Sequence, residues 1–458
     1  MLDPPSDSTQ SRKSSSQDQS SLSPSAMNPS AVSRRTLLAG SLAGSLLAAS
    51  AQAQTEVPSA ARELWQWVRT QPVLDAQVVY LDAAGSGPTW RAAMATEYRV
   101  REQQSTELPV TMFNERWVSE TQRLAERFAA FCGCSADEVV FTHGAGEAIG
   151  QVAAGLDLNA GDEVILGSQE HPAAFSPWLF LARRRGVVIK QVSLPAPLAN
   201  PQEALDLFAA AMTARSRVLA ISHVQYGDGT VLPVRELCDM ARQKGLVSVV
   251  DGAQALGMLS LSLRDLGCDF YAANCHKWLG GCQGTGLLFT RREMLDRLWP
   301  VVPRGIDSTP PVYVPADAPG HNDVPPALHK FGNLVPHLWP ALRGSATALD
   351  FHDQITRARV EARIRELAVY ARLKLQPLSG LKILTPARPG LWAGILTFRI
   401  VGRSSSELAG ALARNSRVHL KALRWPQSED GALRAAFHIF NSPDDIDRLA
   451  QGLRPFAS

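Results

Sequence analysis

The segment DFYAANCHKWLGG, residues 269–281, decides the fold class of this chain of 458 residues. Its apolar part, Phe270 to Ala273, has the length and composition of a buried strand. His276 and Lys277 then interrupt the apolar run, and two glycines follow, which do not prolong regular structure. A lysine at the end of a buried strand is unfavourable unless it is paired or held covalently. Lys277 is therefore the first candidate for a chemical role.

A second buried strand is predicted upstream, over Leu246 to Val250. It ends in Asp251, and Gln254 follows shortly after. An aspartate and a lysine at the ends of two neighbouring strands suit pyridoxal phosphate, because the lysine can form a Schiff base while the aspartate keeps the pyridine nitrogen protonated. The pattern predicts pyridoxal 5'-phosphate as cofactor, Lys277 as the catalytic residue, and Asp251 and Gln254 as cofactor ligands. The simpler alternative is a lysine in a surface turn.

The composition is that of a globular protein with room for two core-bearing units, since 45% of residues are hydrophobic and 19% charged. The net charge is only +3 and no basic run is interleaved with aromatic residues, so a nucleic-acid partner is not expected. The cysteines lack the paired spacing of a metal site, so we expect reduced, mostly buried thiols and no bound metal. They are Cys132, Cys134, Cys238, Cys268, Cys275 and Cys282.

The first 53 residues have the layout of a leader followed by a signal peptide. Residues 1 to about 30 are rich in Ser, Gln and Pro and are expected to be disordered. Arg34-Arg35, a weakly apolar stretch and Ala51-Gln52-Ala53 then resemble a twin-arginine signal with cleavage near Ala53, which predicts the export machinery as a partner and a periplasmic location. The apolar part is too short for stable membrane insertion. A chance Arg-Arg before an alanine-rich linker is the alternative, and Met27 is an alternative start.

Strands alternate with helices from about residue 139 to about residue 290, which is typical of a parallel, doubly wound α/β sheet with its site at the strand C-termini. Apolar spacing predicts further elements on either side of this region. We expect helices over 115–132, 232–245 and 342–375, and strands near 392–400 and 432–439.

The segments DGAQ (residues 251–254), HKWL (276–279) and GTG (284–286) together resemble the class V aminotransferase family of fold-type I pyridoxal-phosphate enzymes. That family includes cysteine desulfurases, isopenicillin N epimerase-like proteins and C–S lyases. The segment YLDAAGSGP (80–88) resembles the family's opening along the active-site mouth and is closer to the epimerase-like branch.

The resemblance covers roughly residues 76–455. It implies an α/β fold with a large, mostly parallel sheet domain over 76–340, followed by a connecting helix and a small C-terminal α/β domain over 341–458. A short helical segment over 54–75 is expected before them. The resemblance also implies a homodimer.

A phosphate cup is expected where the strand at 139–142 turns through glycine into a helix, because free N–H groups at a helix N-terminus bind phosphate. Ala145 and Gly146 would form it from the backbone. The family commonly has threonine at the position of Gly146, so one hydroxyl ligand is missing, and Asn274 is the candidate to compensate. His276, beside Lys277, is expected to contact the cofactor as well.

The resemblance assigns four further residues. His171 is expected to stack on the pyridine ring, where a neutral imidazole can also assist proton transfer. Tyr226 falls where the family has an Asn near the cofactor's phenolic oxygen, and a phenol there can donate the same hydrogen bond. Asn333 is expected to reach the phosphate of the partner subunit. Arg434 suits bidentate capture of a substrate carboxylate. A satisfied loop histidine and an arginine in a surface ion pair are the alternatives for His171 and Arg434.

The sequence leaves three functions open. The first is chemistry at the Cα of an amino acid or an amino-acid-containing metabolite, of the epimerase or transaminase type. The second is a C–S β-lyase. The third is a non-catalytic binding protein on this scaffold, which the joint presence of Lys277, Asp251 and Arg434 disfavours. A persulfide-forming desulfurase is not expected, because no cysteine follows Cys282 to supply its nucleophile. A periplasmic enzyme would also lack an obvious supply of 2-oxoglutarate for repeated transamination.

Overall fold

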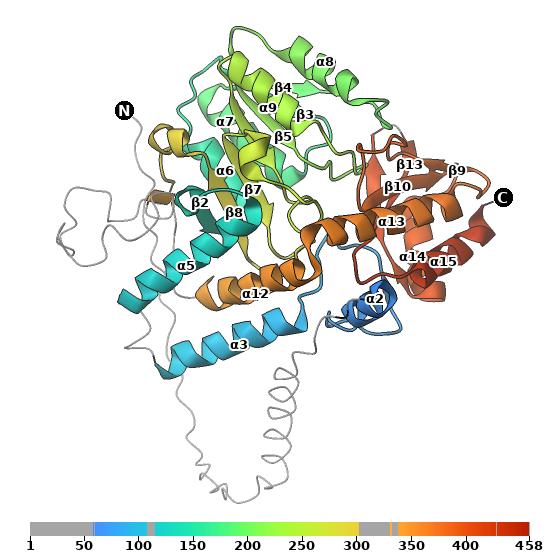
Figure 1. Ribbon diagram of the computed structural model, residues 1–458. Coiled ribbons are helices and arrows are strands. Elements are labelled where there is room, and N and C mark those ends of the chain that lie inside the picture. Colours follow the sequence, from blue (N-terminus) through green and yellow to red (C-terminus); the bar gives the residue numbers. More distant parts are fainter. Residues whose placement is uncertain are drawn as a thin grey trace, which may run out of the picture. The chain divides into compact units, whose positions relative to one another are not determined.

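The computed structural model describes residues 58, 60–107, 115–301, 330–331, 338–426 and 428–457 (Figure 1). The chain divides into two compact units, Met1–Gln54 and Thr55–Ser458, and every described residue belongs to the second. The predicted leader, the signal peptide and Asn333 lie outside the described residues. Within the described part, no helix is long and apolar enough to cross a bilayer.

A seven-stranded sheet forms the centre of this unit, in the order β2-β8-β7-β6-β5-β3-β4. Only β8 runs against its neighbours, and the other strands share one direction. The predicted doubly wound, mostly parallel sheet is therefore confirmed. Its strands are β2 (Val139–Thr142), β3 (Glu163–Gly167), β4 (Val188–Val192), β5 (Ser216–Ser222), β6 (Val247–Asp251), β7 (Phe270–Asn274) and β8 (Gly286–Thr290).

Helices cover both faces of this sheet, because successive strand side chains point to opposite faces and both sets are apolar. Val249 and Phe270 pack with the core under α6 and α7, whereas Val250 and Tyr271 pack with the core under α5, α9 and α12. Figure 1 shows α5, α12 and α3 lying in a row, and α12 contacts both of the others. The helices of this part are α3 (Arg91–Thr106), α5 (Glu115–Cys132), η1 (Ala136–Glu138), α6 (Ala145–Gly155), α7 (Pro172–Arg185), α8 (Pro201–Ala211), α9 (Val234–Gln243), α10 (Leu263–Leu266), η2 (Arg292–Arg297) and α12 (Trp339–Ile355).

A smaller antiparallel sheet, in the order β12-β13-β10-β9, forms the C-terminal part with helices packed against it. The strands predicted near 392–400 and 432–439 correspond to β10 and β13. The elements are α13 (Arg357–Leu375), β9 (Leu381–Ile383), β10 (Ile395–Ile400), α14 (Ser405–Ser416), β11 (Val418–His419), β12 (Lys421–Trp425), β13 (Ser428–Ala436), α15 (Pro443–Leu453) and η4 (Arg454–Phe456).

The N-terminal segment joins this C-terminal part. After α2 (Ala61–Arg69), the short strand β1 (Val79–Tyr80) pairs in parallel with β11, and an isolated bridge links Asp82 to Ala436. Val79 and Leu81 lie in the C-terminal core. Residues 79–82 therefore pack with the C-terminal part, although they precede the large sheet in sequence.

The helix predicted over 342–375 is divided in two. Thr356 separates α12 from α13 and has a φ of +77°, which a right-handed helix cannot contain. Its side-chain oxygen accepts a hydrogen bond from Arg359 N, so it caps the start of α13. The prediction of helical structure over 342–375 is confirmed apart from this one residue, because apolar periodicity carries no signal for a single backbone break.

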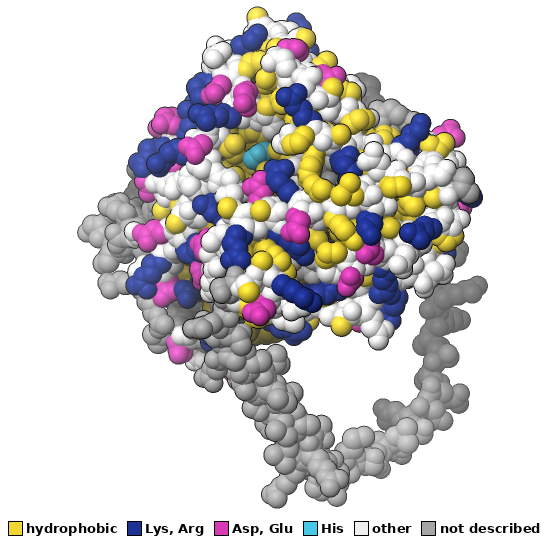
Figure 2. Space-filling model, turned by 45° about the vertical axis from the view of Figure 1, so that its right-hand side comes forward, with side chains coloured by type: hydrophobic (Ala, Val, Ile, Leu, Met, Phe, Trp, Pro, Cys, Tyr) yellow, Lys and Arg dark blue, Asp and Glu magenta, His cyan; other side chains and the backbone are white. Residues whose placement is uncertain are grey.

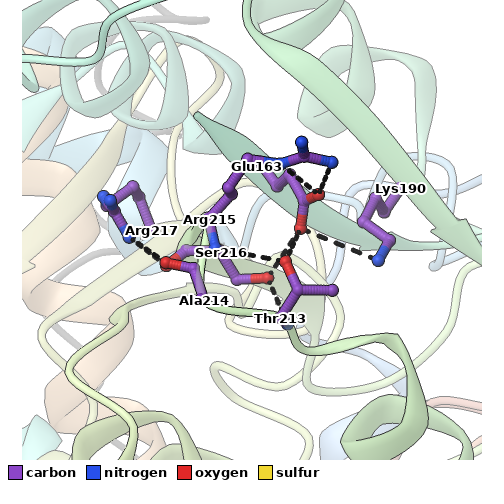
Figure 3. A network of polar contacts seen from close by, with 7 residues as sticks. All are labelled: Glu163, Lys190, Thr213, Ala214, Arg215, Ser216 and Arg217. Atoms are coloured by element: carbon purple, nitrogen blue, oxygen red, sulfur yellow. Dashed lines mark hydrogen bonds and ion pairs between the residues drawn. The ribbon is translucent and has the colours of Figure 1, made fainter. Parts of the chain in front are cut away.

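A polar network fixes the sheet at the edge opposite the strand C-termini (Figure 3). Glu163 begins β3, and its side chain, 2% exposed, accepts hydrogen bonds from Thr213 Oγ1 at 2.5 Å and Ser216 Oγ at 3.0 Å. Arg215 and Lys190 supply positive charge beside it. These donors lower the pKa of Glu163, the hydrogen bond from Thr213 most of all. The carboxylate is satisfied by the protein itself, so we assign it a structural role.

Candidate active site

Lys277 and Asp251 meet where two adjacent parallel strands end. Asp251 is the last residue of β6 and pairs in register with Ala272 of β7, and Lys277 follows β7. Each of the two residues is only 8% exposed. Burial lowers the pKa of Lys277 to about 8, although Asp251 opposes that shift. The predicted adjacency of amine and carboxylate is thus present in the fold.

The Asp251 carboxyl group is buried and held in one orientation. Its Oδ1 accepts a hydrogen bond from Ala253 N at 2.9 Å, which orients the carboxyl group. Burial raises its pKa, while the Ala253 N–H and Lys277 act in the opposite direction. A buried carboxylate gains from a positive partner. The protonated pyridine nitrogen of pyridoxal phosphate would be such a partner, so the pair fits the cofactor.

Gln254 connects Lys277's segment to the opening segment of the site. Its Oε1 accepts from Trp278 Nε1 at 2.8 Å, and its Nε2 donates to Ala84 O at 2.9 Å. A primary amide has two N–H donors, so one remains for the predicted cofactor contact. The structure adds that Gln254 positions the turn on which Lys277 lies.

The predicted phosphate cup lies at the start of α6, but its donors differ from those expected. Asn274 Oδ1 accepts from Ala145 N at 2.8 Å, so that N–H is already engaged. A Cβ on Gly144 would lie 2.7 Å from the same Oδ1, which explains the glycine. The N–H groups of Gly146 and Glu147, in the first turn, have no partner within the helix. The cup therefore relies on these two amides and on the Asn274 amide group.

Two further features of the cup concern Gly146 and His276. A Cβ on Gly146 would lie 3.2 Å from Ala173 Cβ, so the close approach of α7 leaves little room for a threonine. The His276 ring lies beside the cup, 3.7 Å from a Cβ built on Gly144. Its Nδ1 is buried and has no hydrogen-bond partner among the described residues. A phosphate oxygen would satisfy that atom.

His171 and Tyr226 lie against each other on the loops after β3 and β5. Their ring centroids are 5.0 Å apart in an edge-to-face arrangement. His171 Nδ1 accepts from Ala173 N at 3.1 Å, so the proton of the neutral ring is on Nε2. Burial lowers the pKa of His171 to about 4, helped by the positive charges of Lys277 and Arg434. A neutral imidazole is the form expected for stacking on the cofactor.

Arg434 is almost fully buried, at 2% exposure, and lies close to both of these loops. Nη2 donates to Asp82 Oδ1 at 2.7 Å and Nη1 donates to Tyr226 O at 3.0 Å. The guanidinium carbon is 5.4 Å from the centre of the Tyr226 ring. Nε is buried and has no hydrogen-bond partner among the described residues. The edge of the guanidinium that carries Nε is therefore the candidate edge for a carboxylate.

Sequence reasoning missed two acidic residues of the site. Asp82, in the segment YLDAAGSGP, was given no role, yet it holds Arg434. Glu170, which precedes His171, accepts from Ser222 N at 3.1 Å and from Ser222 Oγ at 2.5 Å. Burial raises the pKa of Glu170 to about 8. The only signals were the acidic residue inside YLDAAGSGP and the one directly before His171, and the partners of both are distant in sequence.

Other chemistries find less support in the described residues. No group of three His, Cys, Asp or Glu residues among them could hold a metal ion. All six cysteines are described, all are unpaired thiols, and burial raises the pKa of each. On the face drawn in Figure 2, Lys and Arg side chains are interspersed with Asp and Glu, and the coloured residues there form no extended basic patch.

Comparison with known proteins gives concordant results. Residues 79–449 match the family model described as aminotransferase class-V. The isopenicillin N epimerase of Amycolatopsis lactamdurans is 32% identical, over 85% of this chain and 98% of that protein. That of Streptomyces clavuligerus is 30% identical, over 85% and 97%. The solved structure of a cystine C–S lyase in complex with cysteine persulfide has a TM-score of 0.74 at 21% identity and covers 84% of this chain and 99% of its own.

Proposed function

Because this chain belongs to the class-V aminotransferase family of pyridoxal-phosphate enzymes, we propose that it moves a proton at the Cα of an amino acid or an amino-acid-containing metabolite, as an epimerase-like enzyme. The observation that carries the proposal is the buried pair of Lys277 and Asp251 at the ends of β7 and β6. The two isopenicillin N epimerases, at 30% identity or more, support this branch of the family. Transamination within the same site is the related outcome.

When bound, pyridoxal phosphate supplies an aldehyde that captures the substrate amine and a ring that accepts electrons from a bond broken at Cα. Asp251 would hold the positive charge of the ring nitrogen. Lys277, with a pKa of about 8, is partly neutral near neutral pH and can therefore accept the Cα proton and return it. Gly146, Asn274 and His276 would hold the phosphate.

Substrate orientation would come from Arg434. Its free Nε and the remaining N–H of Nη2 lie on one edge of the guanidinium, which is the geometry for a bidentate carboxylate. His171 and Tyr226 would lie against the cofactor ring and at its phenolic oxygen. Holding the carboxylate fixes which Cα bond lies perpendicular to the ring, and that bond is the one that breaks.

A C–S β-lyase is the second candidate, favoured by the state of the cysteines. Persulfide formation needs a reactive thiolate, and burial raises the pKa of every thiol in this chain. Elimination needs no protein thiol. The likeness to the cystine lyase structure, at 21% identity, shows the shared fold alone.

The test uses purified protein and a panel of amino acids in D2O. We expect a visible absorption band, and reduction with borohydride should leave the cofactor mass on the peptide that contains Lys277. Deuterium at Cα without keto acid supports the epimerase-like function. Pyruvate, ammonia and cysteine persulfide from cystine support the lyase, and stoichiometric keto acid supports transamination. A colourless protein that binds no cofactor would leave only a binding protein.

Export and dimerisation are part of the proposal. Arg34-Arg35 and the Ala51–Ala53 site support twin-arginine export to the periplasm, which N-terminal sequencing of fractionated cells would test. The match to the class-V aminotransferase family supports a homodimer, as the sequence resemblance implies. Light scattering would measure its mass, and in a dimer Asn333 would be the candidate phosphate ligand of the partner subunit.

A further inference from the structure

We infer that the C-terminal sheet sets the position of Tyr226, so that Thr385 and Thr397 are positioning residues for the cofactor although both lie outside the site. The inference rests on the proposed hydrogen bond from Tyr226 to the cofactor's phenolic oxygen. Neither the sequence motifs nor the site geometry explains why Thr385 and Thr397 contact the loop after β5. The inference assigns a function to these contacts.

Three successive carbonyl groups of the loop after β5 are each held by a side chain of the C-terminal part. Tyr226 O accepts from Arg434 Nη1 at 3.0 Å. Gly227 O accepts from Thr397 Oγ1 at 2.7 Å, and Asp228 O accepts from Thr385 Oγ1 at 2.5 Å. Every donor comes from the sheet that contains β10 and β13 or from the residues next to it.

These donors are themselves linked into one rigid group. Thr397 of β10 and Arg434 of β13 are register partners, so their side chains leave the sheet side by side. Thr397 N donates to Thr385 Oγ1 at 2.8 Å, and Leu384 N donates to Thr397 O at 2.8 Å. Thr385 and Thr397 are 2% and 0% exposed, so water cannot replace their hydrogen bonds.

The loop has little freedom to move away from this sheet. Gly229 has a φ of +77°, and a Cβ there would lie 2.7 Å from Ile395 Cβ, so only glycine permits such close packing against β10. On the other side, Asp228 accepts from Thr230 N and from Gln169 Nε2 at 2.8 and 3.2 Å. The position of Tyr226 is therefore determined by the C-terminal sheet rather than by β5 alone.

The consequence for chemistry follows from charge. When the nitrogen of the Lys277 Schiff base loses its proton, negative charge would grow on the phenolic oxygen. A hydroxyl that donates to that oxygen would stabilise this charge, and so lower the pH at the midpoint of the change in the visible absorption band. Loss of the Tyr226 hydroxyl in Tyr226→Phe should raise that midpoint. If the threonines position Tyr226, then Thr397→Val should raise it too, by a smaller amount.

The experiment is a pH titration of the visible band of cofactor-loaded protein, with thermal melts of the same samples. We expect Thr397→Val to raise the midpoint by about 0.5 pH unit, in the direction of Tyr226→Phe. Thr385→Val, which removes the hydrogen bond to Asp228 O of the same loop, gives a second variant if the first folds poorly. Thr397→Ser keeps the hydroxyl and should restore the wild-type midpoint.

Thr290→Val is the matched control, because Thr290 is fully buried on β8 and no described residue forms a hydrogen bond with its hydroxyl. It should leave the midpoint unchanged. A lower melting temperature in Thr397→Val and Thr385→Val with an unchanged midpoint would show a purely structural role and overturn the inference. An unchanged midpoint in Tyr226→Phe would instead remove the proposed role of Tyr226, and the inference with it.

Discussion

Asp82 Oδ1 accepts a hydrogen bond at 2.7 Å from Nη2 of Arg434, a residue 352 positions further along the chain. The arginine is 2% exposed and the Asp82 side chain 20% exposed, so the ion pair lies at the boundary between the site and solvent. It orients the guanidinium, whose Nε has no hydrogen-bond partner in the part of the chain that the structure describes. The opening segment and the last strand of the C-terminal sheet thus build the carboxylate site together.

Replacing Asp82 should therefore loosen the carboxylate site. Asp82→Ala removes the acceptor and leaves a buried guanidinium less well paired, which should lower the free energy of unfolding by about 2 kcal/mol. We expect the apparent affinity for amino acids, read from the visible spectrum, to fall about tenfold. Amino-acid amides, which lack the carboxylate, should show little change. Equal losses for acids and amides would contradict a role in carboxylate binding.

The pH dependence of cofactor capture should report on Lys277. Only the neutral amine attacks an aldehyde, and burial lowers the pKa of Lys277 to about 8. The rate at which apoprotein takes up pyridoxal phosphate should therefore rise with pH around 8, whereas free lysine amines rise near about 10.4. Asp251 raises the pKa of Lys277, so Asp251→Asn should move the midpoint lower still. Stopped-flow absorbance measures both, and a higher midpoint in Asp251→Asn would contradict this electrostatic coupling.

Restoring a hydroxyl to the phosphate cup should help only if space is made for it. Gly146→Thr alone should crowd Ala173, because the new Cβ would lie 3.2 Å from Ala173 Cβ. With Ala173→Gly added, the threonine can donate to the phosphate, and cofactor affinity should rise about threefold to tenfold. Equilibrium titration of apoprotein measures the affinities. Ala173→Gly alone is the control and should leave the affinity unchanged.

Buried neutral histidines should make the fold sensitive to acid. Burial lowers the pKa of His352 to about 3 and that of His438 to about 4. Unfolded histidines bind protons below about pH 6.5, so each lowers the stability by about 1.4 kcal/mol per pH unit as the pH falls from there towards its folded pKa.

His352→Gln should reduce the dependence of the free energy of unfolding on pH by about 1.4 kcal/mol per pH unit, because glutamine can keep the hydrogen bond to Leu279 O without binding a proton. Urea unfolding between pH 6 and pH 4.5 measures this slope. The buried carboxyl groups contribute equally to the slopes of variant and wild type, so their contributions cancel in the comparison. The exposed His419 provides the control, and His419→Gln should leave the slope unchanged. An unaltered slope in His352→Gln would mean that His352 is already protonated in the fold.

The Glu163 network should affect stability and leave the site untouched. Glu163→Ala removes the acceptor of the Thr213 hydroxyl and of the buried Ser216 hydroxyl, and we expect a loss of about 2 kcal/mol in urea unfolding. Because the pKa of Glu163 is lowered in the fold, its contribution is present above its unfolded pKa and is lost as the pH falls. Glu163→Gln should remove that acid dependence. Cofactor affinity should match the wild type in both variants, because the network lies at the opposite edge of the sheet.

Much of the fold was predictable because its signals are local. The fully buried strands β2, β6 and β7 each appear in the sequence as short apolar runs followed by a break, and the helices between them as periodic apolar spacing. The adjacency of Lys277 and Asp251 followed from parallel strands ending at one edge of a sheet. The break at Thr356 was missed, because one residue with a positive φ leaves the apolar spacing on either side unchanged.

The contacts of the candidate site were less predictable. Ala145 was expected to offer its N–H to a phosphate, but Asn274 accepts it from 129 positions away. Gln254 was expected to face the cofactor, and its further hydrogen bonds to Trp278 and Ala84 were not predicted. A side chain that can donate and accept has several satisfactory partners in principle. Which partner is chosen depends on the packing of elements that are distant in sequence.

The sequence by itself determined the α/β class, the strand ends that carry Lys277 and Asp251, and through them the cofactor, because apolar runs and strand breaks are properties of short segments. Tertiary structure alone decided that Asp82 holds Arg434 and that Thr385 and Thr397 hold the loop of Tyr226. Those contacts join the opening segment and the loop after β5 to the C-terminal part, and their geometry exists only once these elements are packed together. The chemistry of the cofactor is thus encoded locally, whereas the orientation of the residues around it is set by long-range packing.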